Sequence, residues 1–483
     1  MSDSAVRLSG VSFSYSGVES DSLAKLELSL RPGEFVVLAG PSGSGKTTLT
    51  RLINGLIPHY YEGSLLGQVV VDGIDPSANA LWRLPVGSVF QNPRAQFFTT
   101  DTTSEIAFGV ENLGLPTAEI LSRVEEAISA MGLADLRDRS VFALSGGEKQ
   151  RVACASVAAV RPAIYVLDEP SANLDLESTR QLREIMAGWK AGGATVVVAE
   201  HRLGFLRDLA DRVLLFADGQ LRTEFSGADF RSLNDEQLHQ LGLRSAWGET
   251  MTATQGPPGG DCFEITGLRC RHRSTHAPGL SAPRPEDAVH VDHLRIPKGK
   301  VTVLVGANGS GKTTLATWLG GLRRDREGRL NDGRRNWNTA ERRRRVFLVL
   351  QDVNHQLFTE SVAEEIALSA RLAGPTGLPI LSEAEIMERL DLVAVADRHP
   401  MSLSTGQKQR VAVATALASG REVVVLDEPT AGLDLHHMNA VADALRVLAD
   451  SGRTVLVATH DIELVAACAD LVIRLDHGIL TPV

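Results

Sequence analysis

Short apolar runs alternate along the chain with segments of helical periodicity. The runs FVVLAG, YVLDEP and TVVVAEH return later as VTVLVG, VVVLDEP and TVLVATH, and all of them are rich in β-branched residues. Between such runs, a segment that begins at Lys46 places apolar residues at 49, 52, 53 and 56, which is the spacing of one helix face. Strands that are apolar throughout are typical of parallel sheets buried on both faces. The pattern therefore predicts an α/β fold with a mostly parallel core sheet.

The pattern appears twice because the sequence itself is repeated. GPSGSGKTT at 40–48 returns as GANGSGKTT at 306–314, and LSGGEKQRVA at 144–153 returns as LSTGQKQRVA at 403–412. Length alone would suggest about three domains, but the repeat predicts two, at 5–247 and 262–483. The Gly-, Pro- and Thr-containing segment 248–261 is expected to be a linker, and the irregular stretch 274–287 an exposed loop insertion.

Composition excludes several classes of protein. Hydrophobic residues make up 43% and charged residues 22% of the 483 positions, which is typical of ordinary soluble globular domains. The net charge of −10 argues against a protein that coats nucleic acid. The four cysteines show no C-x-x-C spacing, so neither a zinc site nor a disulfide framework is expected. The chain also shows no secretion signal and no apolar stretch that approaches a membrane span.

Each copy carries the pattern G-x-x-x-x-G-K-[ST] between an apolar strand and a helix. The glycines let backbone N–H groups surround phosphate oxygens, the lysine bridges the terminal phosphates and the threonine hydroxyl ligates Mg²⁺. These two motifs predict two P-loop NTPase domains. The predicted phosphate-binding residues are Gly40, Pro41, Ser42, Gly43, Ser44, Gly45, Lys46, Thr47 and Thr48, then Gly306, Ala307, Asn308, Gly309, Ser310, Gly311, Lys312, Thr313 and Thr314.

Two acidic residues follow a buried strand in each copy, Asp168 and Glu169 after IYVL and Asp427 and Glu428 after VVVL. An acid at the tip of a strand beside a phosphate loop can reach the Mg²⁺ shell, while its neighbour faces the attacking water. Asp168 and Asp427 are therefore predicted metal ligands, and the two glutamates are predicted catalytic residues.

The order of GxxGSGKTT, a glutamine, LSGGEKQR, LDEPSANLD and a histidine after VVVAE resembles the ATP-binding cassette (ABC) ATPases over nearly the whole chain. The resemblance implies an antiparallel β subdomain and a helical signature subdomain in each cassette, with ATP and Mg²⁺ as cofactors. It also implies that Gln91 and Gln351 contact Mg²⁺ and relay to a transmembrane partner. Asp175 and Asp434 resemble the D-loop aspartate, and His201 and His460 the histidine that contacts the γ-phosphate.

In this family each ATP lies between the phosphate loop of one domain and the signature of the other, so two cassettes on one chain are expected to pair intramolecularly. Site one would combine Tyr15, Lys46, Asp168, Glu169 and His201 with Ser404, Thr405 and Gly406. Site two would combine His272, Lys312, Asp427, Glu428 and His460 with Ser145, Gly146 and Gly147. Both glutamates are retained, so both sites are expected to hydrolyse ATP.

Each site departs once from the family pattern. Tyr15 matches the aromatic residue that stacks on adenine, whereas His272 stands at its counterpart and is either an adenine contact or a loop histidine. Thr405 replaces the first glycine of the signature pair. If that position requires a left-handed conformation, the threonine costs about 1 to 2 kcal/mol. The basic run 341–345 is interpreted as a solvated face rather than a nucleic acid or lipid contact.

The segments between the motifs favour one class of ABC protein. VFQNPRAQFF followed by TSEIAFGVENLGLP resembles the ATPases of energy-coupling-factor (ECF) importers of vitamins and metal ions, and the second copy keeps Gln351, Gln356 and Phe358 in the same frame. The resemblance implies a transmembrane coupling subunit and a substrate-binding membrane subunit, with this chain on the cytoplasmic face of the membrane.

The same residues bear on other classes of ABC protein. An ATPase of a conventional ABC importer or of an exporter would differ only in its partners. A soluble ABC-F translation factor would need a long charged helical linker, and the segment 248–261 is short and Gly/Pro-containing. ABC proteins of DNA repair would need a coiled-coil insertion or zinc-binding cysteines, which are not found.

Overall fold

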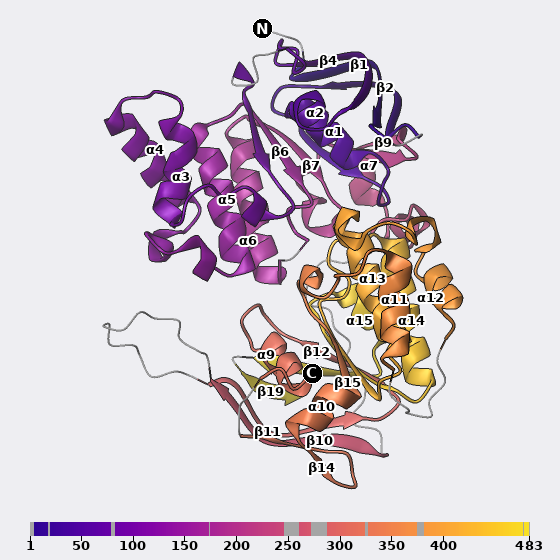
Figure 1. The fold of residues 1–483 in the computed structure, drawn as a ribbon. Coiled ribbons are helices and arrows are strands. Elements are labelled where there is room, and N and C mark those ends of the chain that lie inside the picture. The colour runs from indigo at the N-terminus through magenta and orange to yellow at the C-terminus, as the bar shows by residue number, and fades with distance from the viewer. Residues whose placement is uncertain are drawn as a thin grey trace. The chain divides into compact units, whose positions relative to one another are not determined.

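The computed structural model describes residues 4–17, 20–78, 83–172, 174–245, 260–271, 287–323, 327–373, 381–476 and 478–482. The chain forms two compact units, unit 1 (Met1–Trp247) and unit 2 (Gly248–Val483) (Figure 1). Most of the predicted linker 248–261, nearly all of the predicted loop 274–287 and His272 lie outside the described residues.

Unit 1 contains two sheets. The antiparallel sheet has the order β2-β1-β4, and the larger sheet has the order β5-β6-β7-β3-β8-β9, in which only β9 is antiparallel to its neighbour. The strands are β1 (Val6–Tyr15), β2 (Leu23–Leu30), β3 (Phe35–Ala39), β4 (Gly63–Val71), β5 (Val86–Val89), β6 (Ile164–Asp168), β7 (Thr195–Ala199), β8 (Arg212–Ala217) and β9 (Gln220–Ser226).

Helices cover both faces of the larger sheet of unit 1. In Figure 1, α3 to α6 lie on one side of β6 and β7, and α1 with the antiparallel sheet lies on the other. A separate apolar core lies on each face of the larger sheet. Phe35 and Val37 of β3 belong to one core, and Val36 and Leu38 belong to the other. The helices are α1 (Lys46–Ile53), α2 (Leu56–His59), α3 (Thr102–Glu111), α4 (Thr117–Ala130), α5 (Gly146–Val160), α6 (Leu176–Ala191), α7 (Gly227–Ser232) and α8 (Asp235–Gln240).

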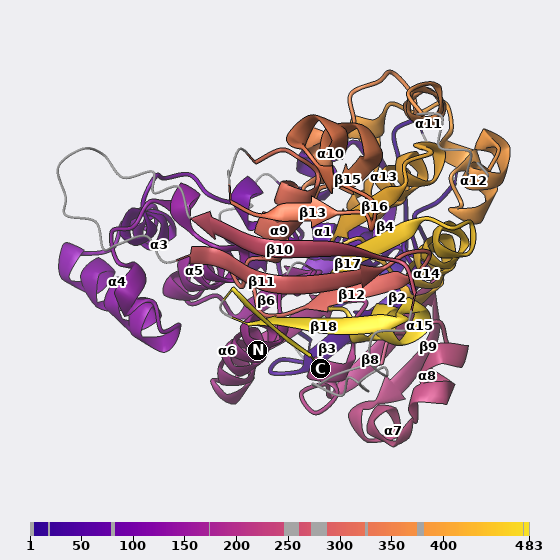
Figure 2. The same ribbon diagram turned by 90° about the horizontal axis from the view of Figure 1, so that it is seen from below.

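Unit 2 repeats this architecture with its two sheets joined. Its strand order is β14-β13-β10-β11-β19-β18-β12-β17-β16-β15, and Figure 2 shows β10, β11, β18 and β12 running side by side. The junction is the pairing of His290 on β11 with Ile479 on β19, where the His290 N–H donates to the Gly478 carbonyl over 2.7 Å. Unit 1 makes the matching bond from Ala24 to Gly219 over 2.9 Å.

The bounds of the unit 2 elements follow the same order along the chain. The strands are β10 (Cys262–Arg271), β11 (Asp287–Pro297), β12 (Val301–Val305), β13 (Arg329–Asn331), β14 (Asn336–Trp337), β15 (Val346–Val349), β16 (Val423–Asp427), β17 (Thr454–Ala458), β18 (Leu471–Asp476) and β19 (Ile479–Pro482). The helices are α9 (Lys312–Leu319), α10 (Thr339–Arg345), α11 (Val362–Arg371), α12 (Glu383–Arg389), α13 (Thr405–Ala418), α14 (Leu435–Asp450) and α15 (Ile462–Cys468). The predicted α/β fold with a mostly parallel core sheet is confirmed in both units.

The basic run 341–345 forms most of α10, and its interpretation as a solvated face was wrong for one residue. Arg342 is buried, donates to the Trp318 carbonyl over 2.6 Å and lies 4.1 Å from the centre of the Trp318 ring. Arg343 and Arg344 are exposed, and Arg345 pairs with Glu422 at 2.8 Å. A helical run of four arginines turns one of them inward when the helix packs on a core, and here a carbonyl and an aromatic face contact the buried charge.

Candidate functional site

In each unit the predicted phosphate loop connects a central parallel strand to a helix, β3 to α1 and β12 to α9. Gly40 has φ 137°, and a Cβ atom there would lie 2.1 Å from the Phe216 carbonyl oxygen, so no larger residue fits. Lys46 reaches back across the loop and donates to the carbonyls of Gly40 and Pro41, both at 2.8 Å. Lys312 donates to Gly306 and Ala307 at 2.7 and 3.0 Å. The ammonium group of the lysine thus lies at a helix N-terminus, and both the ammonium group and the helix dipole favour a bound anion there.

The loop threonine meets the first strand-end acid in both units. The Thr47 hydroxyl donates to Asp168 over 3.0 Å, and the Thr313 hydroxyl donates to Asp427 over 2.5 Å. Burial, together with the charge of Glu169, raises the pKa of Asp168 to about 6. Burial likewise raises the pKa of Asp427 to about 6, against the opposing hydrogen bond from Thr313. A buried carboxylate that lacks a cation gains a proton readily, so this pair of oxygen donors suits a hard divalent cation.

Within the described parts of the chain, no group of three or more His, Cys, Asp or Glu side chains is placed to hold a metal ion. In each unit the threonine hydroxyl and the aspartate carboxylate lie together as oxygen ligands. Mg²⁺ is commonly held by one or two carboxylates together with water and substrate phosphates, and the site fits this mode.

The second strand-end acid has an unusual backbone in both units. Glu169 has φ 45° and Glu428 has φ 52°, which are left-handed conformations that residues other than glycine adopt at a cost. Their backbone N–H groups donate to the carbonyls of Ala199 and Ala458, both over 2.8 Å. The strained backbone turns the glutamate out of the strand direction, so that its side chain meets the residues described next.

The Glu169 carboxylate joins residues from three segments of unit 1. Gln91 donates its side-chain amide to one oxygen over 2.6 Å, and Nε2 of His201 lies 3.1 Å from the other. The structure therefore brings together three side chains that are far apart in sequence. A carboxylate placed beside an amide and an imidazole can accept a proton from a water molecule.

Glu428 is held differently in unit 2. Nδ1 of His460 lies 2.8 Å from one carboxylate oxygen, and the Thr459 hydroxyl donates to the other over 3.0 Å. Burial raises the pKa of Glu428, but His460, Lys312 and Thr459 more than offset this effect, so that the pKa lies below its usual value. Gln351 lines a cavity of about 130 Å³ together with Lys312, Thr313, Asp427 and Glu428.

Tyr15 lies beside the phosphate loop of unit 1. Its hydroxyl is 3.3 Å from that of Thr48 and accepts a hydrogen bond from Arg51 over 2.9 Å. The Arg51 guanidinium also lies 3.9 Å from the centre of the Tyr61 ring. Sequence reasoning missed Arg51 and Tyr61, although Arg51 stands one helical turn after Thr47 and faces the same side as Thr48.

Both signature serines begin a helix. Ser145 caps α5 and Ser404 caps α13, each by accepting the backbone N–H three residues later at 3.3 Å. Thr405 is the first residue of α13 and has a helical backbone, as Gly146 has at the start of α5. The cost considered for a left-handed threonine therefore does not arise. The D-loop candidates Asp175 and Asp434 are buried and cap α6 and α14.

Two segments of the chain, 23–172 and 289–431, match the family described as ABC transporter. The chain belongs to the ABC transporter family. Each matched segment contains one phosphate loop, one signature motif and one pair of strand-end acids, so the chain is an ABC ATPase with two ATP-binding cassettes. The matched segments do not include His201, His460, Asp175 and Asp434, so the roles expected of these residues are supported only by their contacts in the structure.

Similar proteins match this ABC ATPase over its whole length or over about one cassette. A protein of Treponema denticola assigned as an ABC transporter ATP-binding protein is 40% identical, covering 98% of this chain and 96% of that protein. The cbiO1 structure from Clostridium perfringens covers 49% of this chain and 94% of that chain, with 27% identity and a TM-score of 0.44. The structure of ribosome-bound archaeal Pelota and ABCE1 covers 98% and 78%, with 23% identity and a TM-score of 0.66, which shows a shared tandem fold. Of the helices in the described parts of this chain, none has the length and hydrophobicity of a bilayer crossing.

Proposed function

We propose that this ABC ATPase energises a membrane importer of the ECF type for a vitamin or metal ion, from the cytoplasmic face of the membrane. The support from sequence is the stretch VFQNPRAQFF with TSEIAFGVENLGLP in cassette 1 (unit 1) and the shared frame of Gln351, Gln356 and Phe358 in cassette 2 (unit 2). The support from structure is an exposed apolar surface at corresponding positions of both cassettes, described below.

In this proposal the two cassettes pair within the chain and enclose two ATP molecules. Each phosphate loop, 40–48 or 306–314, binds the phosphates of one ATP, and the signature of the other cassette completes the site. Bound Mg²⁺ would neutralise phosphate charge and would be held by Thr47, Asp168 and Gln91 in one site and by Thr313, Asp427 and Gln351 in the other. The N-termini of α5 and α13 then face the γ-phosphates, where the helix dipoles favour negative charge.

The water-activating group would be Glu169 in one site and Glu428 in the other. The lowered pKa of Glu428 keeps its carboxylate ionised at neutral pH, which is the state that accepts a proton. His201 and His460 contact these carboxylates and would also reach the γ-phosphate. We also propose that the two cassettes extend over residues 5–247 and 262–483 and that residues 248–261 link them.

The exposed surface that supports the proposal is formed by residues that follow Gln91 in cassette 1 and Gln351 in cassette 2 along the chain. Phe98 is 74% exposed and Phe142 is 78% exposed, and their counterparts Phe358 and Met401 are 73% and 51% exposed. Phe98 also stacks on the half-exposed Phe108 at 4.8 Å. Exposed apolar clusters of this kind mark protein interfaces, since they lower their free energy when a partner covers them.

A backbone contact holds the two apolar segments of each cassette together. The Thr102 N–H donates to the Arg139 carbonyl over 2.9 Å, and the Val362 N–H donates to the Arg398 carbonyl over 3.1 Å. The same surface is thus built twice on one framework. Helices of a transmembrane coupling subunit would fit such a pair of surfaces, and a substrate-binding membrane subunit would complete the importer.

The proposal is tested by co-purification from native membranes. The tagged chain should bring down a polytopic membrane protein, and the variant Phe98→Asp/Phe142→Asp should lose most of it. Leu66→Asp is the matched control, because Leu66 is an exposed apolar residue on β4, outside this surface. Retention of the partner by the double variant would contradict the docking surface, and co-purification of ribosomes in place of a membrane protein would contradict the importer. A conventional ABC importer or an exporter would be recognised by the identity of the partners.

A further inference from the structure

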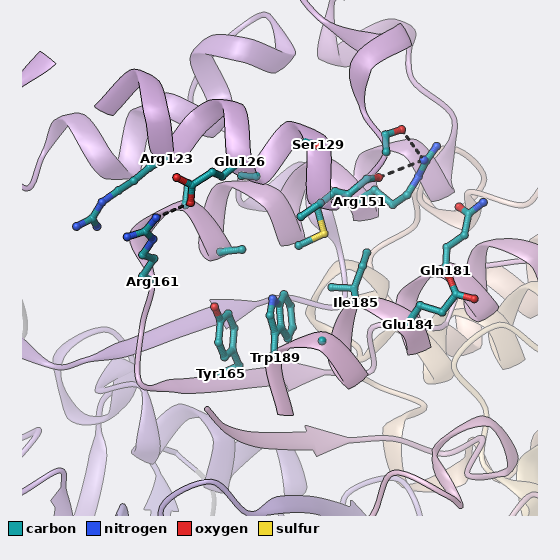
Figure 3. A pocket seen from close by; sticks show the side chains of 17 residues that line it. Arg123, Glu126, Ser129, Arg151, Arg161, Tyr165, Gln181, Glu184, Ile185 and Trp189 are labelled. Carbon is teal, nitrogen blue, oxygen red and sulfur yellow. Dashed lines mark hydrogen bonds and ion pairs between the residues drawn. The ribbon is translucent and has the colours of Figure 1, made fainter. Parts of the chain in front are cut away.

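Cassette 1 contains a cavity of about 680 Å³ between α4, α5 and α6 (Figure 3). None of its lining residues belongs to the phosphate loop or to the strand-end acids, and Arg151 is the one lining residue that lies within the signature stretch LSGGEKQRVA. Its wall includes Tyr165 of β6 and Trp189 of α6, whose rings stack at 4.0 Å. Arg123, Glu126 and Arg161 stand at one end.

Two polar groups of the aromatic wall are left without protein partners. Tyr165 and Trp189 are both more than nine-tenths buried, yet within the described residues neither the hydroxyl nor the indole N–H forms a hydrogen bond with the protein. Figure 3 shows the two rings side by side, with these polar atoms turned toward the side where Glu126 lies. Neither atom is among the fully buried polar atoms that lack a partner, so both are open to the cavity and can donate to a ligand that accepts hydrogen bonds.

Comparison with cassette 2 separates structural residues from residues specific to this cavity. The cassettes align here with an offset of 259 positions, as Ser145 and Ser404 show. Arg151 lines the cavity but donates to the carbonyls of residues 131 and 132, and its counterpart Arg410 donates to those of 390 and 391. Arg151 therefore has a role common to both cassettes and does not point to a ligand.

Four of the remaining lining residues are replaced by other residue types in cassette 2, whereas Glu126 corresponds to Glu385. Tyr165 and Trp189 correspond to Val424 and Leu448, which are buried in the apolar core. Arg123 corresponds to Ser382 and Arg161 to Gly420. The ABC fold is therefore built in cassette 2 without the aromatic pair and without these two guanidinium groups.

Arg161 occupies a position that favours glycine. Its φ is 56° and that of Gly420 is 58°, so both cassettes use a left-handed residue after the helix that begins at the signature. Cassette 1 accepts the cost of a side chain in this conformation. The guanidinium pairs with Glu126 at 2.5 Å, and Arg123 pairs with Glu119 at 2.6 Å, so both cations are held at the cavity.

We propose that this cavity binds a small anion with an aromatic or apolar body, at a site distinct from the ATP sites. Arg161 and Arg123 would attract its carboxylate, phosphate or sulfonate group. The Tyr165 hydroxyl and the Trp189 N–H would donate to acceptor atoms of the ligand. The side chains of Ala127, Met131 and Ile185 provide apolar contact for its body.

The experiment uses two fluorescent probes of similar shape on the full chain, with excess ADP in the nucleotide sites. One is 8-anilino-1-naphthalenesulfonate, which is anionic, and the other is N-phenyl-1-naphthylamine, which is neutral. Arg161→Gly should weaken the anionic probe roughly tenfold and leave the neutral probe unchanged, because only the anion loses a charge-assisted hydrogen bond. Tyr165→Val/Trp189→Leu, which installs the residues of cassette 2, should weaken both probes.

Arg137→Ala is the matched control. Arg137 pairs at 2.6 Å with Glu125 of α4, the helix that also carries Glu126, but Arg137 does not line the cavity. It should bind both probes like the wild type. ATP turnover of Arg161→Gly should stay within about twofold of wild type, which separates loss of the anion from loss of folding. Equal affinity of the anionic probe for wild type and Arg161→Gly would overturn the proposal, as would full binding to the aromatic double variant.

Discussion

The carboxylate of Glu428 lies 2.8 Å from Nδ1 of His460, whereas Glu169 meets the other ring nitrogen, Nε2, of His201 at 3.1 Å. The neighbouring residue accounts for part of the difference. Thr459 donates to Glu428, but at the corresponding position Glu200 accepts the backbone N–H groups of residues 171 and 201 and cannot donate in this way when ionised. The two glutamates proposed to activate water thus have different hydrogen-bond environments.

This difference leads to a prediction for the two glutamates. Glu169→Gln and Glu428→Gln should each lower steady-state ATP turnover, and the double variant should lose about 10²-fold or more, because the amide cannot accept the water proton. The measurement is phosphate release at saturating Mg²⁺ and ATP, with ATP binding measured alongside to verify that the sites still fill. If one single variant retains full activity, the site that contains that glutamate does not contribute to turnover.

A second prediction concerns the second signature glycine of each cassette. A Cβ atom on Gly147 would lie 2.3 Å from the Ser178 hydroxyl oxygen, but one on Gly406 would lie 3.1 Å from a Leu433 methyl carbon. Gly147→Ala should therefore reduce ATP turnover much more than Gly406→Ala. Thr405→Gly should change turnover less than about twofold, because the threonine already has the backbone of a first helical residue. Equal losses of ATP turnover in the two alanine variants would show that the close contact between residue 147 and Ser178 of α6 is not the cause of the loss.

Periodicity and motif order were sufficient to predict the α/β fold, because apolar strands and glycine-rich loops are local signals. The roles of Asp168 and Glu169 could be inferred from their place at a strand end after a phosphate loop, whereas those of Gln91 and His201 came only from the resemblance to a family. Pairings between distant positions were not visible. Nothing near Arg51 indicates that it bonds Tyr15, and Tyr165 and Trp189 become neighbours only when β6 and α6 pack. Conformation at Thr405 also depended on where α13 begins.

A third prediction tests the buried arginine of α10. Arg342→Ala should lower the free energy of unfolding by about 2 to 4 kcal/mol, because it removes a charge-assisted hydrogen bond to the Trp318 carbonyl and the contact with the Trp318 ring. Arg344→Ala is the matched control and should have an effect within about 0.5 kcal/mol, since that side chain is exposed. The measurement is urea denaturation of each variant. Similar destabilisation by both substitutions would indicate that charge in the run matters rather than burial of one residue.

The final prediction concerns the pH dependence of stability near Asp332. Burial raises the pKa of this carboxyl, but hydrogen bonds from the Trp337 indole and from the backbone N–H groups of 334 and 335 outweigh it and lower the pKa to about 2. A folded-state pKa below the unfolded value of about 3.9 means that the ionised carboxylate stabilises the fold above pH 4. That contribution is lost as the pH falls toward 2. Asp332→Asn should therefore be less stable than wild type at pH 7, and the gap should narrow between pH 4 and pH 2.

Urea midpoints followed by tryptophan emission, which includes Trp337, measure this gap at each pH. Asp292→Asn serves as the control, because Asp292 is highly exposed on β11 and its substitution should give nearly the same midpoint as wild type at every pH. Asparagine at 332 keeps the shape and one acceptor oxygen but replaces the other oxygen with an NH2 donor, so it loses a hydrogen bond at every pH. The narrowing of the gap with falling pH, rather than its size at any one pH, therefore reports the ionised carboxylate. A gap that stays constant down to the lowest pH at which both proteins fold would mean that the charge of Asp332 does not stabilise unit 2.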